Sequence, residues 1–360
     1  MLKFGFVGVG QVGGLFVDEA KKYNHETLAF NTANIDLNVL THLEKQEKVH
    51  LIGYNGAGKD RSIGEEAFLS HKEMISERIF EKMKECHVIF PVFAIGGGTG
   101  SGMSALLTKT LTEIFTDKVI SPILFLPDRN ESLRAKMNAL EAFSEISAIE
   151  DIGAMFTIDN QKVMELNHSF TLKEKYEMTR KELIEMLNHF NKSTVKESDI
   201  SNLDKMDFLT ALSERGCAMI TELSIDTEDV KKPTQLGTRF EKSLEFSIFS
   251  KSNLAHLSKV ALLAEVESEL TKSLKLESIF NEIGTPLEVF TGIYETEKES
   301  TLHVLLTGLP FPTELLKEME EDVRIKEDQI VKTLDSARNQ SFSVKSSWTN
   351  SLKRNRRIKV

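Results

Sequence analysis

Gly96-Gly97-Gly98-Thr99-Gly100-Ser101-Gly102 is the most informative segment of this chain. An apolar run over 88–95 precedes it, and a helical pattern over 103–115 follows it. Glycine allows sharp backbone bends, so several N–H groups can converge on one point. The N-terminus of the following helix adds partial positive charge. A strand, a glycine loop and a helix in this order predict a phosphate-binding site.

Composition is that of an ordinary globular protein. The chain has 360 residues, enough for two domains, with 40% hydrophobic and 28% charged residues. No apolar run is long enough to cross a membrane, and the first residues lead directly into a strand, so we expect a cytoplasmic protein without a signal peptide or membrane partner. Cys86 and Cys217 lack metal or redox spacing and are interpreted as buried thiols in a reducing compartment.

Charge is unevenly distributed along the chain. The net charge is −10, yet residues 338–360 contain seven lysines and arginines and no acidic residue. The residues before 338 therefore carry −17, which is −10 minus 7. An acidic body followed by a basic tail predicts a tail that binds an acidic partner.

Strand-like and helix-like segments alternate over the first 160 residues. Strands are predicted at 3–9, 27–30, 49–53, 88–95, 120–126 and 152–158, and helices at 11–23, 64–86 and 103–115. This alternation indicates an α/β fold with a doubly wound parallel sheet. Ligands of such sheets bind at the carboxyl ends of the strands.

The second half has a different pattern. A long helix is predicted at 170–190, a polar stretch at 191–201, and a second helix from near Asp207. Strands at 244–249, 287–294 and 302–306, with a helix at 259–273, indicate an α+β domain. We therefore divide the chain into a nucleotide-binding domain (1–168), a central helix and acidic loop (169–206), an α+β activation domain (207–312), a C-terminal helix (313–337) and a flexible basic tail (338–360).

Two other stretches of the sequence resemble known nucleotide-binding motifs. Residues 8–13 fit G-x-G-x-x-G, the fingerprint of Rossmann oxidoreductases that use NAD. Those enzymes place Asp or Glu at the end of the second strand to bind the ribose, where this chain has Asn31. Residues 53–59 approach the Walker A loop, but Asp60 stands where Ser or Thr must ligate Mg²⁺. Both alternatives are therefore disfavoured.

The seven-residue glycine string is similar to the signature of the tubulin/FtsZ superfamily, whose members close it over the phosphates of GTP. A second motif supports the resemblance, which covers roughly residues 1–310. Residues 202–207 (N-L-D-K-M-D) fit N-x-D-x-x-D, and residues 213–219 (S-E-R-G-C-A-M) fit S-E-x-G-x-A-M. In FtsZ the latter motif lies on a helix.

The resemblance implies that GTP or GDP binds with Mg²⁺, which would be held mainly by phosphates and water. It assigns these residues to the nucleotide: Gly10, Gln11, Val12, Asn31, Ala57, Gly58, Gly97, Gly98, Thr99, Gly100, Glu131 and Asn160. Residues 10–12 would offer N–H groups to the α and β phosphates, with the Gln11 side chain near a phosphate or Mg²⁺.

The remaining assignments follow the same resemblance. Asn31 begins the second loop (31–34), Ala57 and Gly58 belong to a loop that senses the γ-phosphate, and residues 97–100 close over the phosphates. Glu131 would bind the ribose, and Asn160 would contact guanine. Whether Lys59 and Arg134 touch the nucleotide stays open, as does the residue of helix 170–190 that contacts the base, for which Tyr176 is a candidate.

The resemblance assigns hydrolysis to Asn202, Asp204 and Asp207. Carboxylates can orient and polarise the attacking water, but beside the same subunit's GTP they would repel its phosphates. In the family the acidic loop acts on the GTP of the next subunit. Hydrolysis then requires a head-to-tail contact, and contacts of this kind build open filaments.

The charged C-terminal helix and basic tail resemble the TubZ tubulins of plasmid and phage type III partition systems. This resemblance implies a filament that moves or segregates DNA through a DNA-bound adaptor of the TubR type, held by the tail. The alternative within the superfamily is a divergent FtsZ-like cell-division ring protein. Outside it, the alternative is the Rossmann NAD-dependent oxidoreductase.

Overall fold

Apolar segments of the first half form strands that are buried on both faces. The computed structural model describes residues 1–339 except 167–168, 227–228, 230–231, 272–275, 277–279 and 281–283. The strands are β1 (Phe4–Val9), β2 (Glu26–Asn31), β3 (Lys48–His50), β4 (Val88–Ala94), β5 (Val119–Ile120), β6 (Ile123–Leu126) and β7 (Ala154–Asp159). The predicted strand 120–126 is divided because Pro122 has no N–H to donate to a ladder.

Helices connect these strands as the alternation predicts. They are α1 (Gly10–Lys21), α2 (Asn34–Asn38), α3 (Arg61–Ser70), α4 (Lys72–Met83), α5 (Gly98–Ile114), α6 (Leu133–Ser147) and α7 (Asn160–Glu165). The predicted single helix 64–86 is wrong, because the chain breaks at His71 into α3 and α4.

The second half begins with the long helix α8 (Leu172–Ser193), followed by α9 (Lys205–Ser213). The remaining elements are β8 (Gly216–Ser224), α11 (Pro233–Glu245), β9 (Lys259–Val266), α12 (Ser268–Thr271), β10 (Glu288–Glu295), β11 (Thr301–Leu309) and α14 (Thr313–Asn339). Residues 1–320 form one compact unit, and the described residues 321–339 belong to a second.

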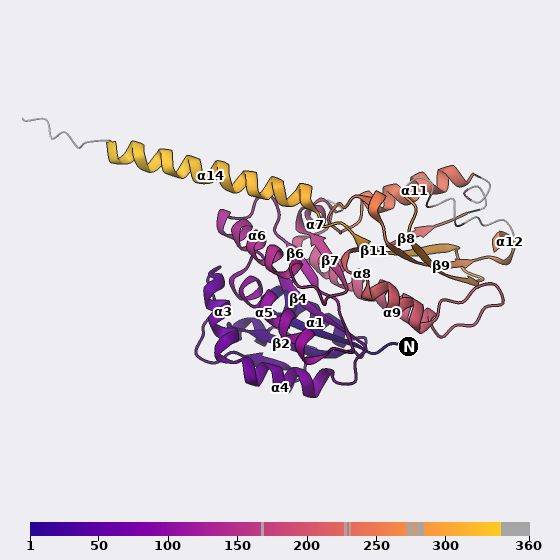
Figure 1. Cartoon of the computed structure of the whole chain (residues 1–360), viewed down its shortest axis with the longest axis horizontal. Coiled ribbons are helices and arrows are strands. Elements are labelled where there is room, and N and C mark those ends of the chain that lie inside the picture. Colours follow the sequence, from indigo (N-terminus) through magenta and orange to yellow (C-terminus); the bar gives the residue numbers. More distant parts are fainter. Residues whose placement is uncertain are drawn as a thin grey trace, which may run out of the picture. The chain divides into compact units, whose positions relative to one another are not determined.

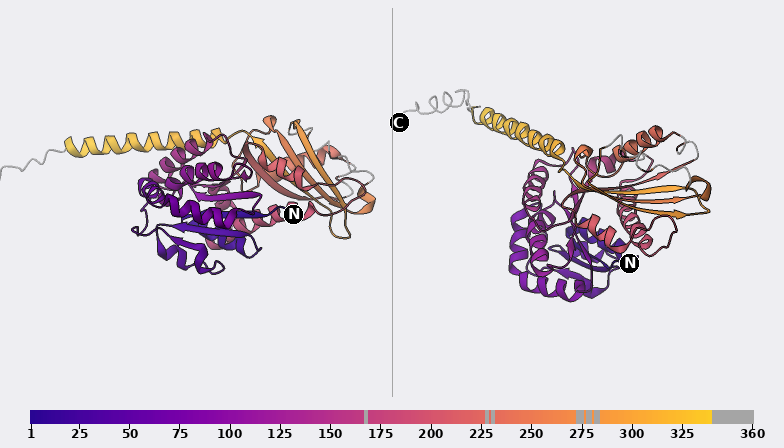
Figure 2. Two further views of the ribbon diagram at one scale, coloured as in Figure 1. Left: turned by 60° about the horizontal axis from the view of Figure 1, so that its bottom comes forward. Right: turned by 45° about the vertical axis from the view of Figure 1, so that its right-hand side comes forward.

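One mixed sheet runs through the first unit. Its strand order is β10-β9-β11-β8-β7-β6-β4-β1-β2-β3, with β5 paired to β4. Strands β1 to β8 pair in parallel, whereas β11 pairs antiparallel with both β8 and β9. Figures 1 and 2 show the early strands at one end of this sheet and the orange strands of the second half at the other. The predicted α/β class is confirmed.

An aromatic cluster joins the sheet to α1, α8 and α9. Phe6 of β1 stacks on Phe90 of β4 with ring centroids 4.9 Å apart, and lies 5.9 Å from Phe16 of α1. Phe208 of α9 stacks on Phe190 of α8 at 5.6 Å. Burial of several such rings stabilises this face by a few kcal/mol each, roughly 1.5–3 on transfer scales.

Three predictions for the second half are wrong. The S-E-x-G-x-A-M motif is not helical: α9 ends at Ser213, and Gly216, whose φ is +128°, begins β8. Residues 259–266 are strand β9 rather than helix, because its consecutive apolar residues are buried on both faces. Residues 244–249 are not a strand, since α11 extends to Glu245 and only Phe249 makes an isolated bridge.

The C-terminal predictions are tested only in part. The charged helix is present as α14, which extends to Asn339. The basic residues beyond it, including the cluster at 353–359, lie outside the described residues. Among the helices that the structure describes, none combines the length and apolar character needed to cross a membrane.

Candidate nucleotide-binding site

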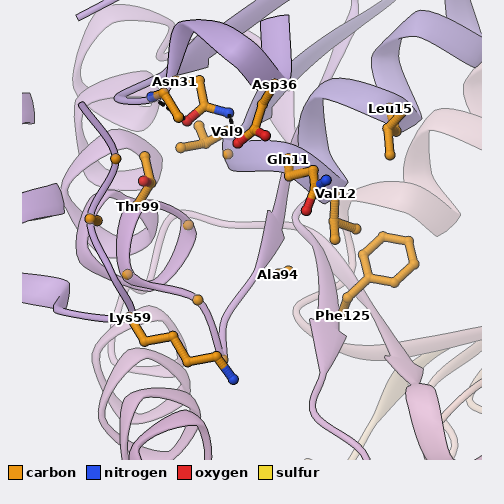
Figure 3. Close-up of a pocket in the computed structure, with 18 of the residues that line it drawn as sticks. Val9, Gln11, Val12, Leu15, Asn31, Asp36, Lys59, Ala94, Thr99 and Phe125 are labelled. Atoms are coloured by element: carbon orange, nitrogen blue, oxygen red, sulfur yellow. Dashed lines mark hydrogen bonds between the residues drawn. The ribbon is translucent and has the colours of Figure 1, made fainter. Parts of the chain in front are cut away.

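A pocket of about 610 Å³ opens at the carboxyl ends of β1, β2, β4, β6 and β7 (Figure 3). All the residues that the sequence assigned to the nucleotide line it: Gly10, Gln11, Val12, Asn31, Ala57, Gly58, Gly97, Gly98, Thr99, Gly100, Glu131 and Asn160. They come from six loops that are distant in sequence. The parallel sheet brings these loops together because each one follows a strand of the same direction.

Two helix N-termini without side-chain caps converge on this pocket. Helix α1 has Val9 at its N-cap and α5 has Gly97, and neither first turn contains an acidic residue. The first N–H groups of a helix have no partner within the helix, so an uncapped, buried terminus needs an external acceptor. By contrast, the side chains of Asp60 and Ser132 cap α3 and α6. The uncapped pair is arranged to bind an anion.

The glycines of the 96–102 loop serve close packing rather than sharp bending. None of the five has a positive φ, and four of them belong to α5 or its N-cap. A Cβ on Gly100 would lie 2.5 Å from the carbonyl oxygen of Ala94, and one on Gly102 would lie 2.1 Å from that of Arg61. The expectation that these glycines provide bends is therefore wrong. They allow α5 to approach β4 and α3 closely enough to direct its N-terminus into the pocket.

Hydrogen bonds between side chains hold the second loop against α5. The hydroxyls of Thr32 and Thr99 are 2.7 Å apart and buried. Asn31 donates to Asp36 Oδ2 at 3.1 Å and accepts from the N–H of Ala33 at 3.0 Å, as Figure 3 shows for the first bond. Because its amide is committed to these partners, Asn31 shapes the pocket wall. Asp36 lines the pocket and was not found by sequence reasoning.

The loop at 56–59 adopts left-handed backbone conformations. Gly56, Gly58 and Lys59 have φ values of +97°, +54° and +63°. Lys59 and Glu131 both line the pocket, and Lys59 Nζ lies 3.4 Å from Glu131 Oε2. Figure 3 shows Lys59 and Thr99 on one side, facing Gln11, Val12 and Phe125 on the other. Lys59 and Glu131 therefore face the same ligand space.

Arg134 does not line the pocket. Its guanidinium pairs with Asp60 Oδ2 at 2.9 Å, and Asp60 Oδ1 accepts from both the hydroxyl and the N–H of Ser62 at the start of α3. The hydrogen bonds from the Ser62 hydroxyl and N–H, with the Arg134 guanidinium adding to them, hold the pKa of the Asp60 carboxyl below its usual value. The acidic residue in the Walker-like stretch is thus a helix cap.

The end of the pocket formed by α7 and α8 has unsatisfied polar groups. The Oδ1 atom of Asn160 is buried and has no hydrogen-bond partner, and the same is true of Nε of Arg180. Burial lowers the pKa of Arg180. Tyr176 and Arg180 lie one turn apart on α8 and both line the pocket. Arg180 was missed, although its i, i+4 spacing from Tyr176 could have indicated it.

The acidic loop lies at the opposite edge of the sheet. Asp204 is the N-cap of α9, accepting from the N–H groups of Met206 and Asp207, and Asp207 accepts in return from that of Asp204. The next residue, Lys205, contacts His87, which immediately precedes β4, at 2.9 Å. The pocket begins beyond the other end of β4, roughly 20 Å away for a strand of this length.

Asn202 completes this loop but is bonded within it. Its side chain accepts from the N–H of Ser198 at 2.7 Å and donates to the carbonyl of Ser198 at 2.8 Å. The structure therefore brings together Asn202, Asp204 and Asp207 and separates all three from the pocket of the same chain.

Comparison with known proteins agrees with this geometry. The family model "Tubulin/FtsZ family, GTPase domain" matches residues 4–168. A tubulin-like protein CetZ of Pyrococcus abyssi is 25% identical over 341 residues, covering 88% of this chain and 92% of the relative. A tubulin-like protein TubZ of Bacillus cereus is 25% identical over 369 residues, covering 91% and 84%. The GTPγS-form protofilament of Bacillus thuringiensis serovar israelensis TubZ has the same fold, with a TM-score of 0.79, 19% identity and coverage of 92% and 94%.

Proposed function

Residues 4–168 of this chain are a GTPase domain of the tubulin/FtsZ family, and on this premise we propose that the chain assembles head to tail into filaments that hydrolyse GTP between subunits. The observation that carries the proposal is the position of the acidic loop. Asp204 and Asp207 lie at the amino edge of the sheet, and the pocket lies at its carboxyl edge. Only a second subunit can bring such groups together.

In this proposal the phosphates occupy the space between the N-termini of α1 and α5. Backbone N–H groups of residues 10–12 and 97–100 bind them, and Lys59 adds positive charge at the opening. When the nucleotide binds, the Glu131 carboxylate gives up its contact with Lys59 and accepts from the ribose hydroxyls. The buried Oδ1 of Asn160, which has no hydrogen-bond partner in the structure, accepts from the guanine amine. Gln11 and Asp36, which both line the pocket (Figure 3), are the side chains suited to hold Mg²⁺ with phosphate oxygens and water.

Hydrolysis needs a positioned water more than covalent chemistry. Asp204 and Asp207 of one subunit would orient and polarise a water against the γ-phosphate of the next, with Asn202 holding the loop. In an isolated subunit the two charges stay away from bound GTP, so nucleotide binds without like-charge repulsion. Assembly then both completes the site and starts the reaction that weakens the filament.

We further propose that the cargo is plasmid or phage DNA, as in the TubZ reading of the sequence. The excess of seven basic residues in 338–360 supports a tail that binds a DNA-bound adaptor of the TubR type, or the DNA itself. CetZ relatives match this chain at the same identity as TubZ relatives, so the cargo rests on the tail alone. A divergent FtsZ-like ring protein is the alternative. The division of the chain into domains that end at residues 168, 206, 312 and 337 also remains a proposal.

The test of a shared active site is the GTPase rate per molecule against protein concentration, with light scattering in parallel. Asp204→Asn is the variant of choice, because asparagine caps helices as well as aspartate while removing the charge. We expect wild-type turnover to rise with assembly, and Asp204→Asn to assemble but hydrolyse GTP at least about a hundredfold more slowly. Asp199→Asn, which removes a charge from the same exposed loop, is the matched control. Turnover independent of concentration would refute the proposal.

The cargo is tested by removing residues 340–360. The truncated chain should assemble and hydrolyse GTP as wild type does, but should no longer co-sediment with adaptor-bound DNA. Retained co-sedimentation would discard the tail, and loss of assembly in the absence of DNA would favour a role for the tail in the filament itself.

A further inference from the structure

A second cluster of ionisable groups lies between α8 and the strands of the second half. Glu222 of β8, His303 of β11 and Glu265 of β9 come from three adjacent strands. His303 is directly opposite Glu222, and Thr301, two residues before it, is opposite Glu265. Because side chains alternate along a strand, all three acidic and imidazole groups emerge on one face. Helix α8 packs against β8 and contributes His189 to the same place.

The ligating atoms of this cluster are close to one another. The imidazole rings of His189 and His303 have centroids 4.0 Å apart. His189 Nε2 lies 3.4 Å from Glu265 Oε1, and His303 Nδ1 lies 3.6 Å from Glu222 Oε2. Each of His189, His303 and Glu265 offers one ligand atom, and these three atoms lie within 4.8 Å of one another.

Two nitrogens in the cluster have no hydrogen-bond partner. His303 is only 6% exposed, and its Nδ1 has no hydrogen-bond partner. The buried Nε2 of His189 has none either, because its approach to Glu265 is not aligned for a hydrogen bond. Leaving a buried polar atom unpaired costs about 1–3 kcal/mol. A cavity of about 400 Å³ lined by His189, His303 and Glu222 adjoins these atoms. There is therefore both an unmet need for a partner and space for one.

We propose that His189, His303 and Glu265 bind a Zn²⁺ ion, with Glu222 or water as the fourth ligand. Two imidazoles and a carboxylate are a donor set that zinc accepts, whereas Mg²⁺ and Ca²⁺ select oxygen ligands. Lys196 now pairs with Glu265. Its side chain is 42% exposed, so it can move into solvent when the cation replaces it.

The site has a structural consequence for the molecule. Its ligands come from α8 and from two strands, β9 and β11, and α8 also carries Tyr176 and Arg180 at the nucleotide pocket. A bound ion would cross-link this helix to the sheet of the second half. This inference does not depend on the proposed filament or cargo, and its test needs neither.

The test measures binding of Zn²⁺ by calorimetry and of Co²⁺ by visible absorption, using the full chain with bound GDP and excess Mg²⁺. We expect one ion per chain, an intense Co²⁺ spectrum of low coordination number, and a raised Tm when Zn²⁺ is added. His303→Gln and His189→Gln should each weaken binding at least about tenfold. His256→Gln, which removes an exposed histidine elsewhere, should bind as wild type does.

Three results would overturn the assignment. The first is the absence of a stoichiometric ion in the wild-type chain. The second is unchanged affinity in the His189→Gln variant, which replaces a partly exposed residue and so leaves the buried core intact even where His303→Gln fails to fold. Zinc binding that is lost equally in His256→Gln would place the ion elsewhere and would also refute it.

Discussion

Gly102→Ala separates two explanations of the glycine-rich segment, because they predict opposite signs. Gly102 is the fifth residue of α5. Helix propensity alone favours alanine over glycine by about 0.8–1.0 kcal/mol. The structure opposes this gain, since the new Cβ would lie 2.1 Å from the carbonyl oxygen of Arg61 and 2.8 Å from the N–H nitrogen of Glu65.

The magnitude follows from what the methyl group meets. Ordinary contact begins at 3.4 Å, so α3 and α5 would have to separate by about 1.3 Å at this point (3.4 minus 2.1). The obstacle is backbone in the first turns of α3, which cannot rotate away as a side chain can. Overpacking costs about 1–3 kcal/mol, and a backbone oxygen at 2.1 Å places this change in the upper part of that range, at about 2–3 kcal/mol. After the propensity gain of about 0.8–1.0 kcal/mol, a net loss of about 1–2 kcal/mol is left.

The assay is thermal unfolding of the nucleotide-free chain followed by circular dichroism. A loss of this size lowers Tm by about 2–8 °C. Gly14→Ala is the matched control, because Gly14 is the fifth residue of α1 and its Cβ would meet only the two methyl groups of the Leu40 side chain, at 3.3 and 3.7 Å. We expect that variant to be neutral or up to about 1 kcal/mol more stable. A Gly102→Ala chain as stable as wild type would refute the packing argument.

Three further predictions concern single side chains. Thr99→Ala removes the buried hydroxyl that is hydrogen-bonded to Thr32 and should weaken GTP binding about fivefold, which corresponds to about 1 kcal/mol. Thr99→Ser should restore the affinity for GTP. Equal affinities of Thr99→Ala and wild type in a fluorescent-nucleotide titration would contradict a role of this hydroxyl in GTP binding. Arg180→Met should raise the Tm of the nucleotide-free chain, because it removes a buried Nε without a partner. The same change should weaken GTP binding about 10- to 150-fold, for the loss of a charged hydrogen bond of about 1.5–3 kcal/mol; unchanged affinity would exclude contact with the nucleotide. Burial lowers the pKa of His25 to about 4, despite its bond to Asn188. The unfolded chain then binds the extra proton between pH 6.5 and 4, so the free energy of unfolding should fall by up to about 3 kcal/mol as pH falls through this range. His25→Gln should flatten that slope in denaturant titrations, and an unchanged slope would place the titration in another group.

The first half was predicted well because its signals are local. Parallel strands buried on both faces appear as short apolar runs, and each is followed by glycine or an N-cap residue. The twelve nucleotide residues were found because each lies in such a loop, and the resemblance set their order. Their placement around one pocket agrees with that assignment, while their roles remain proposals.

The second half was predicted less well because its signals are ambiguous. Lys259–Val266 reads equally as a buried strand or as part of a helix, and only pairing with β10 and β11 decides between them. The helix expected through residues 213–219 fails at Gly216, whose φ of +128° few other residues can adopt. Asp36 and Arg180 were missed because neither belongs to a recognisable motif.

Local sequence patterns were sufficient to predict the α/β class, the loops that line the pocket and the acidic motif at 202–207. These properties are written in residue order, since glycines, apolar runs and cap residues act over a few positions. The three-dimensional arrangement was needed to show that the loop glycines serve close packing, and that Asp204 lies at the opposite edge of the sheet from the pocket. It also brought His189, Glu265 and His303 together, although the first and last of them are 114 positions apart in the sequence (303 minus 189). Contacts between distant segments depend on strand register and helix packing, which no local pattern records.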